Sequence, residues 1–320
     1  MDDLVGGSRV SGKEWAVHSV LFLLTGLTAT VAGVQWLNKD PLELSNLPEG
    51  LPYSGLILLF LASHEMGHYF AARAHHVSST LPYFIPFPSF LGLFPFGTLG
   101  AVIRLRQRIN SATTLFDIGA AGPIAGFVAS LGMLVIGFLT LPPLVYLYSI
   151  HPDYAHLQII PADGLRFGGS MIYRLIELSI PGPASYVPPM TEIYHYPLLC
   201  VGWFGMFVTA MNLLPVGQLD GGHICTALFP RHSRSIQRIT LVLLLLLGTA
   251  GLLPLVGIDA MPGWSGWLIW ALLLFFFLRR ARGTQMPENA SEPLDLYRRL
   301  LGWVCFAILL LTFVPVPISL

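Results

Sequence analysis

The chain has 320 residues, of which 54% are hydrophobic and 11% are charged, and its mean hydropathy is +0.68. This composition is far more apolar than that of an average soluble domain, so it excludes an ordinary soluble protein and indicates an integral membrane protein. The formal net charge is zero, which gives no reason to expect a nucleic-acid partner.

Long apolar runs recur along the whole chain, each about as long as the ~20 residues that a membrane-spanning helix needs. They cover residues 15–37, 52–73, 113–141, 197–215, 239–257, 262–278 and 300–317. We therefore predict an all-α polytopic membrane protein with six or seven transmembrane helices, folded as a single membrane domain over residues 1–320. Whether there are six or seven transmembrane helices stays open, because only a short turn joins the fifth and sixth apolar runs.

Basic residues predict the orientation of these helices, because they accumulate in cytoplasmic loops. With the N-terminus inside, all but three of the 17 Lys and Arg residues fall in inner segments, the exceptions being Lys39, Arg166 and Arg174. We therefore expect a protein of a bacterial cytoplasmic membrane with its N-terminus toward the cytoplasm.

The second apolar run contains the sequence LASHEMGHYF, which includes an HExxH motif. In a helix His64 and His68 share one face, where both imidazoles can bind one metal ion, while Glu65 can act as a base on the attacking water. Catalytic zinc usually has three protein ligands. Ala71 and Ala74 stand where the HExxHxxGxxH pattern has Gly and His, so the third ligand must come from elsewhere in the chain.

A second polar motif, NLLPVGQLDGG, ends the fourth apolar run. Asp220 is the candidate third ligand, because it precedes Arg231 by about as many residues as His64 precedes Arg73. If both helices end near their arginines, the two side chains reach a similar depth. The inner-half position then places the expected metal site toward the cytoplasmic face.

Together the two motifs resemble those of the site-2 protease family, intramembrane metalloproteases that carry HExxH on one helix and NxxPxxxxDG on a later one. Asn212, Pro215, Asp220 and Gly221 match the second motif. The stretches LPYFIPFP and FDIGAAGPIAG are similar to those of the EGY-type subgroup. The resemblance covers a three-helix catalytic core at about 52–222, with flanking helices at about 15–37 and 239–317.

The resemblance implies that His64, His68 and Asp220 bind one zinc ion per chain. It also implies that Glu65 is the general base and that Asn212 positions the substrate or the developing oxyanion. Asn212 has an alternative use as a hydrogen-bonding residue between helices. For Glu65 the alternative is a salt bridge with Arg73.

The expected function is that of a zinc-dependent intramembrane endopeptidase, which hydrolyses a peptide bond in or near the transmembrane segment of another membrane protein, as in regulated intramembrane proteolysis. Its partners would be that substrate and the lipid bilayer. A metal transporter or sensor using the same His/Glu/Asp site is the alternative. A Ste24- or HtpX-type protease fits less well, because neither Glu177 nor Glu192 is followed by Asp or Asn four residues later.

The apolar segment from Leu81 to Leu105 is too rich in proline and glycine to form a helix. We expect a re-entrant or β segment that ends in an extended piece from Gly97 to Arg106. Its free edge would receive an unwound substrate by strand addition, or the segment would only anchor the chain in the membrane.

Three other features have simpler interpretations. Gly119, Gly122 and Gly126 on the third apolar run predict close packing against the metal-bearing helices, with no part in chemistry. His223 is either a fourth ligand or, as we favour, a cap or loop residue. The outer loop at about 142–196 has no assigned role.

Overall fold

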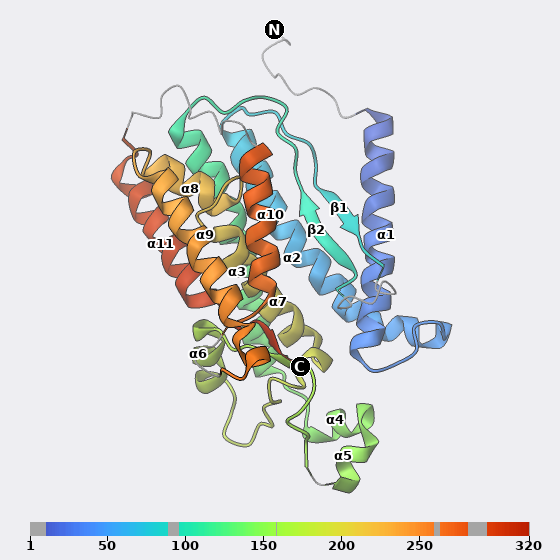
Figure 1. Cartoon of the computed structure of the whole chain (residues 1–320). Coiled ribbons are helices and arrows are strands. Elements are labelled where there is room, and N and C mark those ends of the chain that lie inside the picture. The colour runs from blue at the N-terminus through green and yellow to red at the C-terminus, as the bar shows by residue number, and fades with distance from the viewer. Residues whose placement is uncertain (1–10, 89–95, 158, 259–262, 281–292, 320) are drawn as a thin grey trace.

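The computed structural model describes residues 11–88, 96–157, 159–258, 263–280 and 293–319. This part of the chain is mostly helical (Figure 1), as the predicted fold class requires. Each of the predicted apolar runs contains a long helix. These helices are α1 (Gly12–Trp36), α2 (Leu47–Ala74), α3 (Ala112–Leu139), α7 (Pro197–Leu213), α9 (Ser233–Ala250), α10 (Gly266–Arg280) and α11 (Leu296–Thr312).

Shorter elements connect the long helices. They are η1 (Leu44–Asn46), β1 (Tyr83–Pro86), β2 (Thr98–Val102), α4 (Leu144–Ile150), α5 (Pro152–Leu157), β3 (Arg166–Phe167), α6 (Met171–Ser179), η3 (Ile193–His195), α8 (Asp220–Leu228), η4 (Leu253–Val256) and β4 (Ile318–Ser319).

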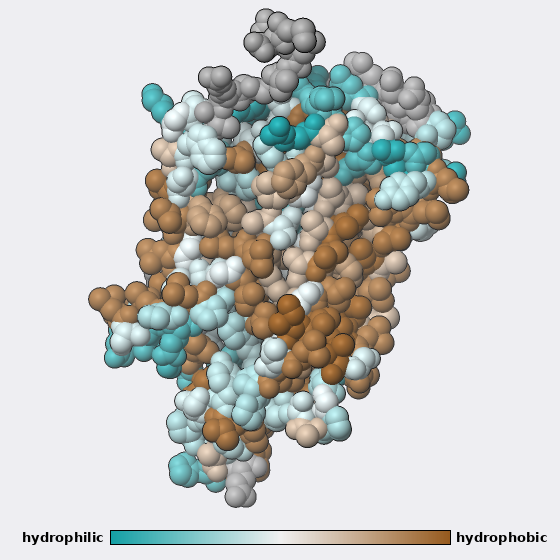
Figure 2. Space-filling model, turned by 180° about the vertical axis from the view of Figure 1, so that it is seen from behind, coloured by the Kyte–Doolittle hydropathy of each residue, from teal (hydrophilic) through white to brown (hydrophobic). Residues whose placement is uncertain are grey.

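Three helices of the described residues, α1, α3 and α9, are long and apolar enough to cross a membrane. Helices α7 and α10 contain shorter apolar stretches. Figure 2 shows hydrophobic residues covering the middle of one face and hydrophilic residues gathering toward its two ends. These features fit a membrane protein, although fewer helices qualify as spans than the six or seven predicted.

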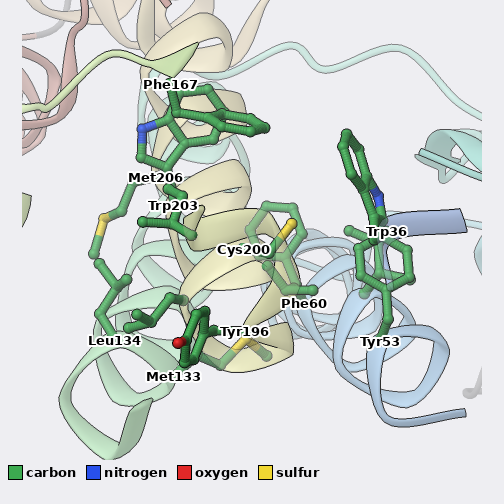
Figure 3. Close-up of a cluster of buried hydrophobic side chains, with 14 of the residues drawn as sticks. Trp36, Tyr53, Phe60, Met133, Leu134, Phe167, Tyr196, Cys200, Trp203 and Met206 are labelled. Carbon is green, nitrogen blue, oxygen red and sulfur yellow. The ribbon is translucent and has the colours of Figure 1, made fainter. Parts of the chain in front are cut away.

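The main hydrophobic core lies between α1, α2, α3 and α7 (Figure 3). Phe60, Leu134 and Trp203 are fully buried there, and the Trp203 indole donates a hydrogen bond of 2.6 Å to the Gly168 carbonyl. Between the helices of a membrane protein such side chains stabilise the fold by close van der Waals packing, since lipid tails are as apolar as they are. This core fixes α2 against α3 and α7, the helices from which the candidate site is built.

Helices α2 and α3 approach each other very closely. A Cβ atom at Gly67 would lie 2.5 Å from the Ala121 carbonyl oxygen and 3.1 Å from the Ala125 Cβ. No larger residue fits at this crossing, so small residues on both helices bring the two backbones together. The predicted packing role of the small residues of α3 is confirmed here.

The proline-rich segment forms a two-stranded antiparallel hairpin, in which Tyr83 pairs with Val102 and Phe84 with Ala101. The register shifts before Pro86, as expected for a residue that lacks a backbone donor. Strand β2 confirms the predicted extended piece, whereas a re-entrant path is not established. Residues 89–95 of this segment lie outside the described residues.

An ion-pair cluster joins three helix ends on the side of the molecule where the basic residues were expected. Asp117 of α3 accepts hydrogen bonds of 2.8 and 2.7 Å from Arg298 of α11, and it lies 2.7 Å from the Nε2 atom of His75, which follows α2. The end of α2 and the starts of α3 and α11 therefore meet at one end of the molecule, in agreement with the alternating helix directions predicted from charge.

Candidate active site

Helix α2 presents the three polar residues of the HExxH motif as buried side chains. Because they are four residues apart on a regular helix, His64 and His68 place their rings on the same face. Their Nε2 atoms lie 3.1 Å apart. Two imidazole nitrogens thus face one point within the protein, as the sequence predicted.

The chain reverses after α7 and brings a carboxylate to the same point. Backbone between Leu214 and Leu219 is irregular, with Gly217 in the left-handed region at φ 60°, and α8 begins at Asp220. The Asp220 Oδ2 atom lies 3.4 Å from the Nε2 atoms of both His64 and His68. The structure therefore brings together the three residues that the sequence proposed as metal ligands.

The geometry of these three atoms fits a zinc ion. Tetrahedral coordination with ligands at about 2.0–2.2 Å requires ligand atoms roughly 3.3 Å apart, close to the observed 3.1, 3.4 and 3.4 Å. His68 Nδ1 lies 2.7 Å from the Ile118 carbonyl oxygen, which can only accept a hydrogen bond. The neutral His68 ring therefore donates from Nδ1 and directs the lone pair of Nε2 at the site, which is how histidine ligands are commonly oriented.

A cavity of about 330 Å³ opens beside the three ligands. Glu65 and Asn212 line it, and the Asn212 Nδ2 atom lies 3.4 Å from His64 Nε2. Ile103, the residue that follows β2, lines the same cavity. The cavity therefore joins the Glu65 carboxylate, the Asn212 amide and the end of a strand in one space, beside the predicted metal position.

Two glycines of α3 form the wall behind the histidine rings. A Cβ atom at Gly122 would lie 2.1 Å from His68 Nε2, and one at Gly126 would lie 3.0 Å from His64 Nδ1. The view that these glycines have only a packing role is therefore incomplete, since they leave the space that the rings occupy. The sequence carried a signal for this: the glycines are four residues apart, like the two histidines that they face.

Arg73 and His223 both make contacts that differ from those expected of them. Arg73 donates a hydrogen bond of 3.2 Å to the Tyr69 hydroxyl, and the described ion pairs do not join it to Glu65. His223 lies inside α8 and lines the cavity, so the expected cap or loop position is wrong. The reason is that α8 begins at Asp220, which places His223 almost one turn later on a neighbouring part of the helix surface.

Comparison with known proteins assigns the chain to a family. The family model of peptidase family M50 matches residues 53–254, which include both motifs. The chain belongs to peptidase family M50. This membership confirms the resemblance to site-2 proteases seen in the sequence and supports the expected class, a zinc metalloprotease.

The relatives of this M50 chain include three plant proteins of the EGY type. It is 29% identical over 240 residues to the "Probable zinc metalloprotease EGY1, chloroplastic" of Arabidopsis thaliana, covering 69% of this chain and 41% of the relative. The rice (Oryza sativa subsp. japonica) protein of the same name is 31% identical over 210 residues, 66% of this chain and 33% of the relative. The Arabidopsis "Probable zinc metalloprotease EGY2, chloroplastic" is 28% identical over 310 residues, 96% of this chain and 50% of the relative.

These comparisons correct the expected location. The chain spans half the length of these relatives or less, and their names describe chloroplastic proteins. Relatives with chloroplastic names contradict the expectation of a bacterial cytoplasmic membrane, which is therefore wrong. The physical reason is that the distribution of Lys and Arg orients helices relative to a bilayer and carries no information about which membrane that bilayer belongs to.

Proposed function

We propose that this M50 chain is a zinc-dependent intramembrane endopeptidase, which hydrolyses a peptide bond in or near the transmembrane segment of another membrane protein. The observation that carries the proposal is the convergence of His64, His68 and Asp220 on one point beside the cavity that Glu65 lines. The three ligands leave a coordination position open, which is the arrangement of catalytic rather than structural zinc sites.

The side chains around the cavity have distinct proposed roles. When bound by His64, His68 and Asp220, zinc would polarise the scissile carbonyl and acidify water. Glu65 takes a proton from the attacking water and returns it to the leaving amine. Asn212, whose amide lies beside His64, donates a hydrogen bond to the substrate carbonyl as negative charge develops on its oxygen.

We further propose that the substrate binds as an extended strand along β2. Helices bury their peptide bonds in intrahelical hydrogen bonds, so a helical substrate must unwind before its backbone can be attacked. Strand β2 pairs with β1 along one edge, and residues 101–103 line the cavity at its end. A substrate added to the other edge would be held by main-chain hydrogen bonds next to Glu65.

Proline substitutions between Ala101 and Leu105 test this strand. Proline removes a backbone donor, so the Val102→Pro and Leu105→Pro variants should cleave substrate roughly ten-fold more slowly or worse, at unchanged zinc content. Alanine at the same positions keeps the N–H group and serves as the matched control. Equal rates for the proline and alanine variants, measured in proteoliposomes, would remove strand addition from the mechanism.

The membrane arrangement is also part of the proposal. All the predicted apolar runs hold helices, so we propose six or seven spans in one domain over residues 1–320, with the hairpin as a re-entrant or interfacial segment and the catalytic core at about 52–222. The cluster of Asp117, His75 and Arg298 supports a common basic end for α2, α3 and α11.

Reversible removal of the metal tests the proposed activity. Purified chain in proteoliposomes, incubated with membrane proteins of known sequence, should produce fragments whose new termini map to a transmembrane segment by mass spectrometry. A chelator should abolish these fragments, and added zinc should restore them, because the ligands are protein side chains that persist without metal. Fragments that persist after complete removal of zinc would overturn the proposal.

The same proteoliposomes distinguish a protease from a metal transporter. Hydrolysis requires Glu65 as a base, whereas zinc transport through the ligands would not. Zinc flux into proteoliposomes that survives the Glu65→Gln substitution, with no fragment formed by wild type, would favour transport.

A further inference from the structure

A second group of metal-ligating side chains lies far from the candidate active site. Its members are His151, at the end of α4, and Glu192 and His195, at η3. Figure 1 places α4 and α5 at the end of the molecule opposite to the N-terminal end of α1 and to α8. The ligand atoms of the group all lie within 4.8 Å of one another.

Glu192 and His195 share one side of the turn because they are three residues apart, and in a 3₁₀-helix such side chains eclipse. The His195 ring is 1% exposed and Glu192 is 2% exposed. The His195 Nδ1 atom lies 2.5 Å from the Trp36 carbonyl oxygen at the end of α1, so Nδ1 carries the donated hydrogen. In the neutral ring the Nε2 lone pair therefore points toward the group.

The Nε2 atom of His195 faces two further ligand atoms. His151 Nε2 lies 2.9 Å from it and Glu192 Oε2 lies 3.4 Å from it, while His151 Nε2 and Glu192 Oε2 are 4.0 Å apart. These distances bracket the roughly 3.3 Å that separates ligands in a tetrahedral zinc site. The arrangement resembles that of His64, His68 and Asp220 in spacing and donor types.

One carboxylate oxygen in this group lacks a partner. Glu192 Oε1 accepts a hydrogen bond of 3.2 Å from the Tyr154 hydroxyl, but Oε2 is buried and accepts no hydrogen bond from the described residues. Its described ion-pair partners are only the two histidines. A buried carboxylate is costly unless it is paired or coordinates a metal, so a cation at the point that Oε2 faces would compensate its charge.

From this geometry we propose that His151, Glu192 and His195 bind a second zinc ion. Two imidazoles and a carboxylate are the donor set that suits zinc, and the partly exposed His151 gives the ion a path of entry. The ion ties α4 to η3 and, through the hydrogen bond from His195 to Trp36, to the end of α1. It therefore orders the outer loop that the sequence left without a role.

Metal counting in a variant that lacks the first site tests the proposal. In the His64→Ala/His68→Ala background, the full chain purified after zinc addition should still hold one zinc ion per chain by mass spectrometry. Adding His151→Ala should remove that ion, and adding Glu192→Gln should weaken its binding at least ten-fold. His156→Ala, which alters an exposed histidine of α5 in the same loop, is the matched control and should keep the ion.

Thermal unfolding provides a second measurement that does not depend on proteolysis. Zinc should raise the midpoint of the His64→Ala/His68→Ala protein, because a ligand that binds only the folded chain stabilises it. The shift should disappear with His151→Ala, whose side chain lies at the edge of the group. If the His64→Ala/His68→Ala protein binds no zinc and its unfolding midpoint does not change with zinc, the second site is overturned. The three side chains would then form a metal-free His–His–Glu network. Unchanged zinc content between wild type and the double variant would instead refute the first site.

Discussion

Glu65→Gln is expected to abolish proteolysis while leaving the zinc content of the protein unchanged. The glutamine has the same size and keeps a polar group in the cavity, but it cannot accept the proton of the attacking water. General acid–base catalysis typically contributes about 10²–10⁴-fold, so turnover should fall by at least about 10²-fold. The ligating atoms belong to His64, His68 and Asp220, so the metal should remain bound.

The measurement combines initial rates in proteoliposomes with zinc content per chain. Glu49→Gln is a matched control, because Glu49 lies in the first turn of the same helix and forms an exposed pair with Lys39. That variant should cleave at the wild-type rate. Proteolysis that survives Glu65→Gln would refute the assignment of Glu65 as the base, whereas loss of zinc would show that the side chain helps to hold the metal.

Gly122→Ala is expected to remove the catalytic zinc ion although position 122 carries no ligand. Its new methyl group would lie 2.1 Å from His68 Nε2, far inside van der Waals contact. The contact is with the atom that is proposed to bind zinc, so the ring can relieve the clash only by leaving its position. Zinc affinity should fall by more than the ~10–100-fold typical when a group that orients a ligand is lost, and proteolysis should fall with it.

Gly132→Ala is the control for this prediction, because it makes the same change in the same helix where nothing lies within 4 Å of the added carbon. Alanine favours a helix over glycine by about 1 kcal/mol, so neither variant should weaken α3 itself. The Gly122→Ala protein should elute as a folded species with one zinc ion fewer per chain than Gly132→Ala. Equal zinc content in the two proteins would show that the wall formed by α3 can move.

The two proposed metal sites have different expected roles, one in catalysis and the other in holding the outer loop in place. The first lies beside a cavity with a base and a strand end, whereas the second joins loop segments around a buried carboxylate. Variants of His151 should therefore change loop order and stability before they change the chemistry at Glu65.

Several properties of this protein follow from the sequence by itself, because they depend on composition or on local helix geometry. Its apolar content indicated a helical membrane protein. The four-residue spacing of His64 and His68 placed both rings on one face, since an α-helix has a fixed period. Proline and glycine between Leu81 and Leu105 excluded a helix there, and the hairpin confirmed an extended segment.

The sequence joined Asp220 to the two histidines, but tertiary structure decided which other distant residues meet. His64 and Asn212 are 148 positions apart, and their approach depends on how α2 packs against α7. The spatial role of Gly122 depends on how α3 packs against α2, because its spacing from Gly126 alone does not show that the two glycines face the imidazole rings. His151 and His195 meet only through the folding of the outer loop, since residues 44 positions apart in an aperiodic segment have no spacing rule that would join them. Local geometry therefore predicted the arrangement within each of the two motifs, whereas the packing of helices and loops determined how the motifs and the residues around them come together.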